Sequence, residues 1–321
     1  MYKTAECVSP MHPDKICDRI SDAILDACLE QDPMSRVAIE TMGGHGIITI
    51  TGELTTKAYV DCREIVKKIV GDKYGVQINI VKQSPEISQG VDIGGAGDQG
   101  IMVGYACNDN EDMIPQELYL SRSLCKFIYE KYPFDGKTQI TLDENGKINT
   151  IVASFQNVTK EILEETCLNW YKYELEQFFI GKLYCNPAGD WSQGGFEADT
   201  GLTGRKLAVD NYGPQIPIGG GCFSGKDATK VDRSGAYKAR QMAVQLLKAT
   251  PEAKEVFVKL AYSIGIAEPV MVTAIVDGKS IEIKNSNATP NEIIESLDLR
   301  KPQFSETAKW GHFGNNFKWD L

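Results

Sequence analysis

The sequence predicts an α+β fold built from three related modules. One helix–strand–strand–helix–strand order recurs along the chain without any residue-level repeat. Strands come in pairs between helices, which favours mixed or antiparallel sheets over a parallel doubly wound sheet. The length of 321 residues is enough for two or three domains with their own cores. We place the modules at residues 1–98, 99–194 and 195–321 and leave open an exchange of strands between them.

The first module begins with an amphipathic helix after Pro13. Apolar residues recur there at every fourth position, the helical period: Ile16, Ile20, Ile24 and Cys28. Aspartates share this spacing. Asp14 lies in the first turn, where the helix dipole favours a carboxylate, and we expect the others to form a solvated face: Asp18, Asp22 and Asp26. Strands are predicted over 36–41, 46–52 and 76–80, and Thr55 or Thr56 is expected to cap a helix that ends at Gly71.

The same order returns twice. The second module has predicted helices over 115–131 and 159–179, strands over 137–142 and 147–155 around an Asn145-Gly146 turn, and a short strand over 182–185. The third has a helix over 234–248, strands over 256–263 and 270–276, and a helix capped near Thr289. Glycine-rich segments separate these elements, at 82–100, 186–204 and 213–227, and we expect the site on them because functional residues concentrate on such loops.

Composition excludes several classes of protein. The net charge of −10 argues against non-specific binding to nucleic acid or to an acidic membrane. No apolar run approaches the roughly 18 residues of a membrane span, and the first residues lack the apolar core of a secretory leader. The nine cysteines are scattered, odd in number and never spaced C-x-x-C. We therefore expect reduced thiols in a cytoplasmic protein.

Residues 220–227 read GGCFSGKD, one position short of a phosphate-binding P-loop. Asp227 stands where a P-loop has Ser or Thr, and the preceding YGPQIPIG is broken by prolines, so a true P-loop is disfavoured. Two interpretations stay open. The glycines, Lys226, Lys230 and Arg233 can bind an anion at the start of the following helix, or the segment is a glycine-rich turn with solvated charges.

Four other short motifs combine turn residues with charge: HPDK at 12–15, GAGDQG at 95–100, FDGK at 134–137 and DTGLTGRK at 199–206. Each alone is more typical of a turn than of a site. Their order is informative. Together with GGGCFSGKDATKVDRS and IGIAEP, they follow the order found in the S-adenosylmethionine synthetase family, which this chain resembles from TAECVS near residue 4 to WGHFG at 310–314.

The resemblance implies three α+β modules around a pseudo-threefold axis, in agreement with the predicted element order. It also implies a reaction: the sulfur of L-methionine attacks ribose C5′ of ATP, and the released tripolyphosphate is hydrolysed to phosphate and diphosphate. Family members use Mg²⁺, two ions per site, and K⁺. They form homodimers, in some cases homotetramers, with active sites between the subunits.

The resemblance also assigns residues. The catalytic set matches His12, Lys137, Arg205 and Lys226. Further ATP contacts match Lys15, Asp135, Trp191, Asp199, Lys206 and Ile264. The methionine site matches Glu53, Gln83, Asp98, Asp199 and Lys230. The Mg²⁺ ligands match Asp14 and Asp232, and the K⁺ ligand matches Glu40.

The chain departs from the family pattern in three places. The loop over the site, 83–94, is shorter than in most members. Asp190-Trp191 stands where Arg-Phe is usual, so that a carboxylate is expected near the nucleoside, and Pro10-Met11 replaces Glu-Gly before HPDK. Two alternatives to an active synthetase follow: a non-catalytic regulatory subunit, and a tripolyphosphate hydrolase that has lost alkyl transfer through its shortened loop.

Overall fold

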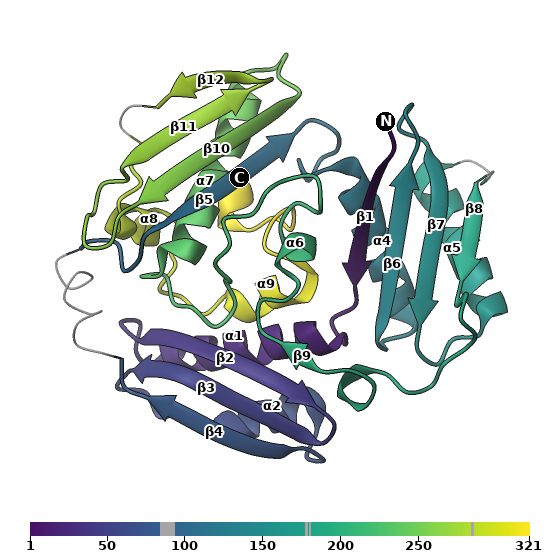
Figure 1. Ribbon diagram of the computed structural model, residues 1–321, viewed down its shortest axis with the longest axis horizontal. Coiled ribbons are helices and arrows are strands. Elements are labelled where there is room, and N and C mark those ends of the chain that lie inside the picture. Colours follow the sequence, from purple (N-terminus) through teal and green to yellow (C-terminus); the bar gives the residue numbers. More distant parts are fainter. Residues whose placement is uncertain (84–93, 177–178, 180, 284–285) are drawn as a thin grey trace.

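In the part of the chain that the structure describes, three four-stranded sheets each carry helices on one face (Figure 1). The computed structural model describes residues 1–83, 94–176, 179, 181–283 and 286–321. The predicted α+β class with three modules is confirmed. The sheets are mixed or antiparallel, as expected: β3–β4 and β7–β8 are the parallel pairs, and the remaining neighbours are antiparallel.

The first sheet has the order β4-β3-β2-β9. Its strands are β2 (Arg36–Gly44), β3 (Ile47–Thr55), β4 (Gly75–Val81) and β9 (Gly201–Leu202), and it packs with α1 (Pro13–Gln31) and α2 (Cys62–Val70). The predicted start of α2 is wrong. Thr55 is still part of β3, and Asp61 caps the helix by accepting from the N–H groups of Arg63 and Glu64 at 2.9 and 3.3 Å.

The second sheet has the order β1-β6-β7-β8. It consists of β1 (Lys3–Val8), β6 (Gly136–Leu142), β7 (Ile148–Phe155) and β8 (Lys182–Cys185), with α4 (Gln116–Lys131) and α5 (Lys160–Leu175) on one face. The third has the order β12-β11-β10-β5, from β5 (Gly100–Cys107), β10 (Glu255–Tyr262), β11 (Met271–Val276) and β12 (Lys279–Glu282). It packs against α7 (Val231–Ala249), which α8 (Pro290–Ser296) contacts in turn.

Strands from distant parts of the chain share sheets. The N-terminal strand β1 pairs with β6, β5 pairs with β10, and β9 pairs with β2. Neither β1 nor β5 is among the predicted strands, because each completes a sheet whose other members lie far away in sequence. Two short helices fill the centre: α6 (Leu207–Asp210) and α9 (Phe304–Trp310). Among the described residues, none of the helices combines the length and the apolarity that a membrane crossing needs.

The prediction of a solvated aspartate face on α1 is wrong. Asp22 is fully buried and forms a bidentate ion pair with Arg233, at 2.7 and 2.9 Å. Asp26 caps α9, accepting from three consecutive backbone N–H groups, of Gln303, Phe304 and Ser305. Asp18 is 2% exposed and accepts from the N–H of Gly204 at 2.8 Å. Residues between 204 and 305 supply hydrogen-bond and ion-pair partners for these aspartates. The row of charges therefore lies inside the protein.

Candidate active site

The first charged cluster surrounds the start of α1. The His12 imidazole caps the helix, its Nδ1 accepting from the N–H of Asp14 at 3.2 Å. One oxygen of the buried Asp14 carboxylate accepts from the N–H of Leu202 at 2.9 Å, and the other accepts from Lys206 at 2.5 Å. Arg205 Nε lies 3.6 Å from the same carboxylate. The motifs HPDK and DTGLTGRK, far apart in sequence, thus form one cluster.

Burial and charge fix the protonation states of this cluster. Burial, followed by the charge of Lys206, lowers the pKa of His12 to about 4, so the imidazole is neutral at physiological pH. Burial opposes ionisation of Asp14, but hydrogen bonds from Lys206 and Leu202 outweigh it and lower the pKa of that carboxyl. With Nδ1 accepting, the remaining proton of His12 is on Nε2. The cluster therefore carries one carboxylate, two cations and a neutral N–H donor.

The FDGK motif lies beside this cluster. Asp135 accepts from the N–H of Gly195 at 2.8 Å, and burial raises the pKa of its carboxyl. The charges of Lys137 and Asp199 both act on the pKa of His12, Lys137 lowering it and Asp199 raising it. These side chains, predicted separately from three motifs, are therefore within electrostatic range of one imidazole.

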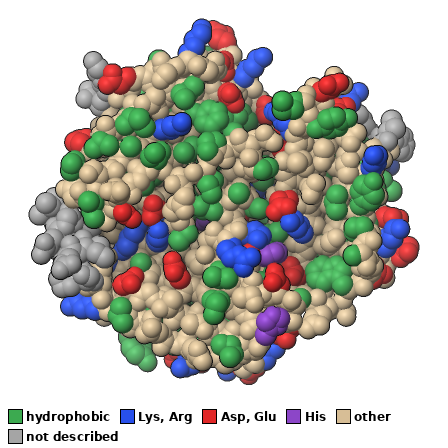
Figure 2. All heavy atoms as spheres, viewed as in Figure 1, with side chains coloured by type: hydrophobic (Ala, Val, Ile, Leu, Met, Phe, Trp, Pro, Cys, Tyr) green, Lys and Arg blue, Asp and Glu red, His purple; other side chains and the backbone are tan. Residues whose placement is uncertain are grey.

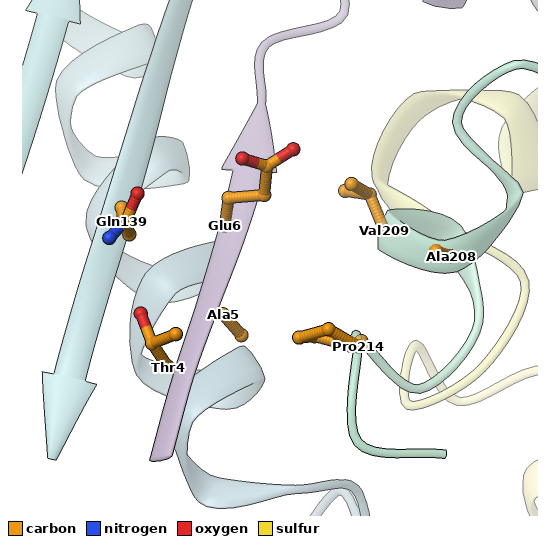
Figure 3. A pocket seen from close by; sticks show the side chains of 8 residues that line it. Thr4, Ala5, Glu6, Gln139, Ala208, Val209 and Pro214 are labelled. Carbon is orange, nitrogen blue, oxygen red and sulfur yellow. The ribbon is translucent and has the colours of Figure 1, made fainter. Parts of the chain in front are cut away.

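Glu6 belongs to the same group of charges and is absent from the sequence prediction. Its carboxylate accepts from Lys137 Nζ at 2.6 Å, across the β1–β6 pair. Figure 3 shows the Glu6 side chain extending from β1 beside Val209 of α6, at a largely apolar hollow of about 200 Å³. The sequence prediction missed Glu6 because it did not include the strand β1. Alternation along this strand places Glu6 on the same face of the sheet as Lys137.

The second cluster surrounds the start of α7. Lys226 Nζ donates to Asp232, which lies in the first turn of that helix, at 2.6 Å. A Cβ at Gly221 would lie 2.3 Å from the Asp232 carboxyl, so a side chain there would displace that carboxylate from its position beside the loop. Burial disfavours the charge on Lys226, but Cys222 and Asp232 outweigh it and raise the pKa of the ammonium group.

Strand β2 connects the two clusters. Its residue Ala38 forms an isolated bridge with Lys226, and Met42 pairs with Leu202, which binds Asp14. Four residues of strand separate these positions, or about 13 Å at roughly 3.3 Å per residue. Glu40 lies between them and is exposed. Figure 2 shows cationic, acidic and histidine side chains close together near the centre of this face.

Two predicted lysines are already engaged within the chain. Lys15 is 1% exposed, forms a short ion pair with Asp210 and lies 3.8 Å from Asp18. The structure thus turns Lys15 to the interior, away from Asp14. Lys230 donates to Asp227 at 2.5 Å, and the same carboxylate oxygen accepts from the N–H of Val37 at 2.7 Å.

Residues assigned to methionine and adenine lie around the second cluster and the β2–β3 pair. Glu53 is exposed and pairs with Ala38 across the strands. The N–H of Gln83 donates to Thr55 Oγ1 at 3.4 Å. The loop with Ile264 binds the GAGDQG loop through Ala96, which donates to Ile266 O at 3.0 Å and accepts from Gly265 N–H at 2.8 Å. Asp98 on that loop acts on the pKa of Lys226.

The Asp190-Trp191 pair is held by neighbouring backbone and side chains. Asp190 Oδ1 accepts from the N–H of Lys160, the first residue of α5, at 2.9 Å and from Asn186 Nδ2 at 3.2 Å. Trp191 Nε1 donates to Asn186 Oδ1 at 3.3 Å. The Asp190 carboxylate is thus directed at a helix start and not at the cation clusters. The shortened loop of the sequence prediction, apart from Gln83 and Gly94, lies outside the described residues.

Comparison with known proteins places this geometry in a family. Residues 1–85, 93–189 and 193–321 match the family models of the N-terminal, central and C-terminal domains of S-adenosylmethionine synthetase. The S-adenosylmethionine synthase of Wolinella succinogenes is 40% identical, over 99% of this chain and 94% of the relative. That of Clostridium tetani is 41% identical, over 97% and 93%, and that of Mesoplasma florum 40%, over 99% and 96%.

The alignment with the Wolinella protein extends over 365 positions, more than the 321 residues of this chain, so the relative carries insertions. All three domains are nevertheless matched, in their order along the chain. The chain therefore belongs to the S-adenosylmethionine synthetase family.

Proposed function

We propose that the protein forms S-adenosylmethionine from ATP and L-methionine, and that it then hydrolyses the tripolyphosphate to phosphate and diphosphate. The observation that carries this proposal is the pair of carboxylate–lysine clusters that β2 connects, Asp14 with Lys206 and Asp232 with Lys226. A polyanion that reaches both clusters meets cations along its length. The two loops that supply the lysines and the two helix starts that supply the carboxylates match motifs of the family.

The alkyl transfer needs positioning and charge stabilisation more than a base. A thioether sulfur is a neutral nucleophile, so methionine must be held in line with C5′. Negative charge develops on the leaving oxygen and triphosphate as the C–O bond breaks. Lys137, Arg205, Lys206 and Lys226 are the cations that we assign to it. Neutral His12, whose Nδ1 accepts from the N–H of Asp14 and whose proton is therefore on Nε2, is assigned as a donor to the leaving oxygen.

The donor set fits Mg²⁺ that arrives with the substrate. Within the described residues no group of three or more acidic, histidine or cysteine side chains is arranged to hold a metal. Mg²⁺ commonly uses one or two carboxylates together with substrate phosphates. Asp14 and Asp232 each supply one, so we assign one Mg²⁺ to each and K⁺ to Glu40. When bound, Mg²⁺ would neutralise phosphate oxygens. Lys206 and Lys226, which pair with these carboxylates, are assigned to the same phosphates.

The remaining residues are assigned to the two substrates. We assign Glu53, Gln83, Asp98, Asp199 and Lys230 to methionine, and Asp135, Asp199, Trp191 and Ile264 to the nucleoside. Lys15 supports the site from behind through Asp210, which lies in α6 shortly after Arg205 and Lys206. From this placement we assign Lys15 as a positioning residue, whereas the resemblance implied a direct ATP contact.

A homodimer is part of the proposal. Figure 1 looks onto faces of the sheets that the helices leave uncovered, and large apolar side chains on them are exposed: Met42, Val81, Ile101, Tyr184, Leu202 and Met271. Such a broad face favours association with a second copy. Glu53 lies on it, so sites between subunits are expected. All nine cysteines are free, which supports a reducing, cytoplasmic setting.

One experiment tests the function. The purified protein is incubated with ATP, L-methionine, Mg²⁺ and K⁺, and S-adenosylmethionine, phosphate and diphosphate are measured. Formation of all three confirms the full reaction. Phosphate and diphosphate from added tripolyphosphate, without S-adenosylmethionine, would instead identify the hydrolase alternative. A regulatory subunit would give no product from ATP with methionine or from tripolyphosphate, and it would stimulate a relative's enzyme on mixing. The presence of His12, Asp14, Lys226 and Asp232 in charged clusters disfavours a regulatory subunit.

A further inference from the structure

A cavity of about 550 Å³ lies where α1, α4 and α9 meet. None of the residues assigned above to ATP, methionine or the metals lines it. Its walls carry three cations and two aromatic rings: Arg19, Lys126, Lys309, Tyr129 and Trp310. A concentration of cations in a hollow is unexpected for a chain with a net charge of −10.

Two of these cations donate hydrogen bonds to neutral acceptors. Arg19 Nη1 donates to the carbonyl oxygen of Pro10 at 3.2 Å, and Lys126 Nζ donates to Asn315 Oδ1 at 3.1 Å. Neither forms an ion pair with a carboxylate of the described residues. Both are half-buried, and burial lowers the pKa of Arg19 and of Lys126. Glu306 acts on the charge of Arg19, and Asp112 and Glu130 act on that of Lys126, but burial outweighs these carboxylates. Each cation is therefore incompletely compensated, and an anion bound here would be stabilised by both.

The aromatic wall lies next to these charges. The Trp310 and Tyr129 rings meet edge to face, with 5.6 Å between centroids, and Lys126 Nζ lies 5.8 Å from the Trp310 centroid. Lys309 is paired with Glu306 at 2.7 Å, and Glu130 is the carboxylate on the lining. The lining thus has a cationic part and a flat apolar part side by side, which suits a ligand with an anionic group and a planar ring.

We propose that this cavity binds a small phosphate-bearing molecule with a planar ring, of the nucleoside monophosphate class. Arg19 and Lys126 contact the phosphate, because a guanidinium fork matches phosphate oxygens, and Trp310 packs against the ring. The position is close to the active site without being part of it. Arg19 holds the carbonyl of Pro10, two residues before His12, so the ligand lies behind the turn that carries His12 into its cluster.

The test is a binding experiment without methionine or Mg²⁺, so that it does not depend on turnover or on the proposed function. AMP and inorganic phosphate are titrated by calorimetry into the full chain, into Arg19→Gln/Lys126→Gln and into the active-site variant Lys226→Gln. We expect an AMP site that weakens at least tenfold in the double variant and is unchanged in Lys226→Gln. We also expect AMP to bind this site at least tenfold more tightly than phosphate.

Tryptophan fluorescence locates the ligand. The change on adding AMP should vanish in Trp310→Phe and persist in Trp191→Phe, the matched control near the active site. If the double variant misfolds, the single variant Lys126→Gln still tests the site, provided that its circular dichroism equals that of the wild type. AMP binding that is equal in the full chain, the double variant and Lys126→Gln would overturn the site and leave Arg19 a structural clamp for Pro10. Equal affinity for phosphate and AMP would overturn the ring contact.

Discussion

Lys206 donates to the Asp14 carboxylate at the start of α1, with 2.5 Å between Nζ and Oδ2. The start of α7 repeats the arrangement, with Lys226 and Asp232 at 2.6 Å. Each carboxylate assigned to Mg²⁺ therefore has a lysine as its counter-ion. Asp14 and Asp232 would hold Mg²⁺, which would supply positive charge to the triphosphate, while Lys206 and Lys226 are assigned to its phosphates. Arg205 Nε, 3.6 Å from Asp14, adds a further cation to the first cluster.

Asp14→Asn and Asp232→Asn should each lower turnover by at least a hundredfold at saturating Mg²⁺. Each change removes a charged ligand that faces a polyanion, and electrostatic contributions of this kind are worth roughly 3–4 kcal/mol. The amide retains an acceptor oxygen for the N–H of Leu202 in Asp14→Asn, so the fold should persist. The measurement is kcat over a range of Mg²⁺ concentrations, beside thermal unfolding. Near-normal kcat in either variant, or equal loss in the exposed control Asp72→Asn, would contradict the assignment.

The pairing of these charges shows what the sequence can and cannot predict. Asp14 is predictable in the first turn of a recognisable helix, whereas Asp232 was assigned by the resemblance, since the predicted helix begins at 234 and α7 begins at Val231. Lys206 and Lys226 are predictable as cations on glycine-rich loops. Lys226 and Asp232 are only six positions apart, but the pairing of Lys206 with Asp14 is not predictable, because those residues are 192 positions apart. The prediction for Lys15 failed to anticipate its buried partner for the same reason.

His12→Gln should flatten the acid side of the stability profile. Burial and then the charge of Lys206 lower the pKa of His12 from 6.5 to about 4. Between these values the unfolded chain binds more protons than the folded one, so stability rises with pH through this window and is lost as pH falls. At about 1.4 kcal/mol per pH unit, the full effect is on the order of 3 kcal/mol.

Urea unfolding between about pH 4 and 7.5 measures this effect as the difference between the wild type and His12→Gln. His312 is also buried with a lowered pKa, but it is present in both proteins and cancels. The wild-type curve should fall more steeply on acidification. Parallel curves for the two proteins would show that His12 titrates normally and that its imidazole is not held neutral by the cluster.

The buried pair of Asp22 and Arg233 should be among the most sensitive positions for stability. Asp22→Asn leaves the fully buried guanidinium without its counter-charge, which typically costs about 3–5 kcal/mol. The double variant Asp22→Leu/Arg233→Met removes both charges and should recover a large part of that loss. Denaturant unfolding of Asp22→Leu, Arg233→Met and the double variant measures the coupling. Additive losses would mean that the two side chains do not depend on each other, against the bidentate geometry.

This pair also shows where pattern reasoning fails. Aspartates at every fourth residue of a helix look the same from the sequence whether water or protein lies beside them. The deciding residues, Arg233 for Asp22 and the N-terminus of α9 for Asp26, are more than 200 positions away. The strands β6, β7 and β8 were predictable because their alternation or turn signals are local. Strand β1 was not predictable, because no local sequence signal indicates that it completes a sheet formed by distant residues.

Subunit exchange should restore activity between two inactive variants, if sites are shared across the dimer. His12→Ala removes the donor at the α1 cluster, and Glu53→Ala removes a carboxylate on the uncovered sheet face. Mixed dimers then contain one site with both residues intact, so activity up to roughly a quarter of the wild type is expected when subunits exchange randomly. Exchange is verified with tagged subunits. Demonstrated exchange without any return of activity would place both residues in the same subunit's site.

Asp190→Arg should change the stability of the protein more than its choice of nucleotide. From the sequence we expect a carboxylate near the nucleoside here, which together with Trp191 would weaken the preference for ATP over GTP. The structure directs Asp190 at the N–H of Lys160, at 2.9 Å, where it supports the start of α5 together with Thr159. Loss of such a contact typically costs about 1 kcal/mol, within a range of roughly 0.5–2, and Asp190→Asn should lose least because it keeps an acceptor.

The measurements are unfolding free energies of Asp190→Arg, Asp190→Ala and Asp190→Asn, beside kcat/KM for ATP and GTP. A tenfold or larger change in the ATP-to-GTP ratio for Asp190→Arg, with unchanged stability, would show that this side chain acts on the nucleotide after all.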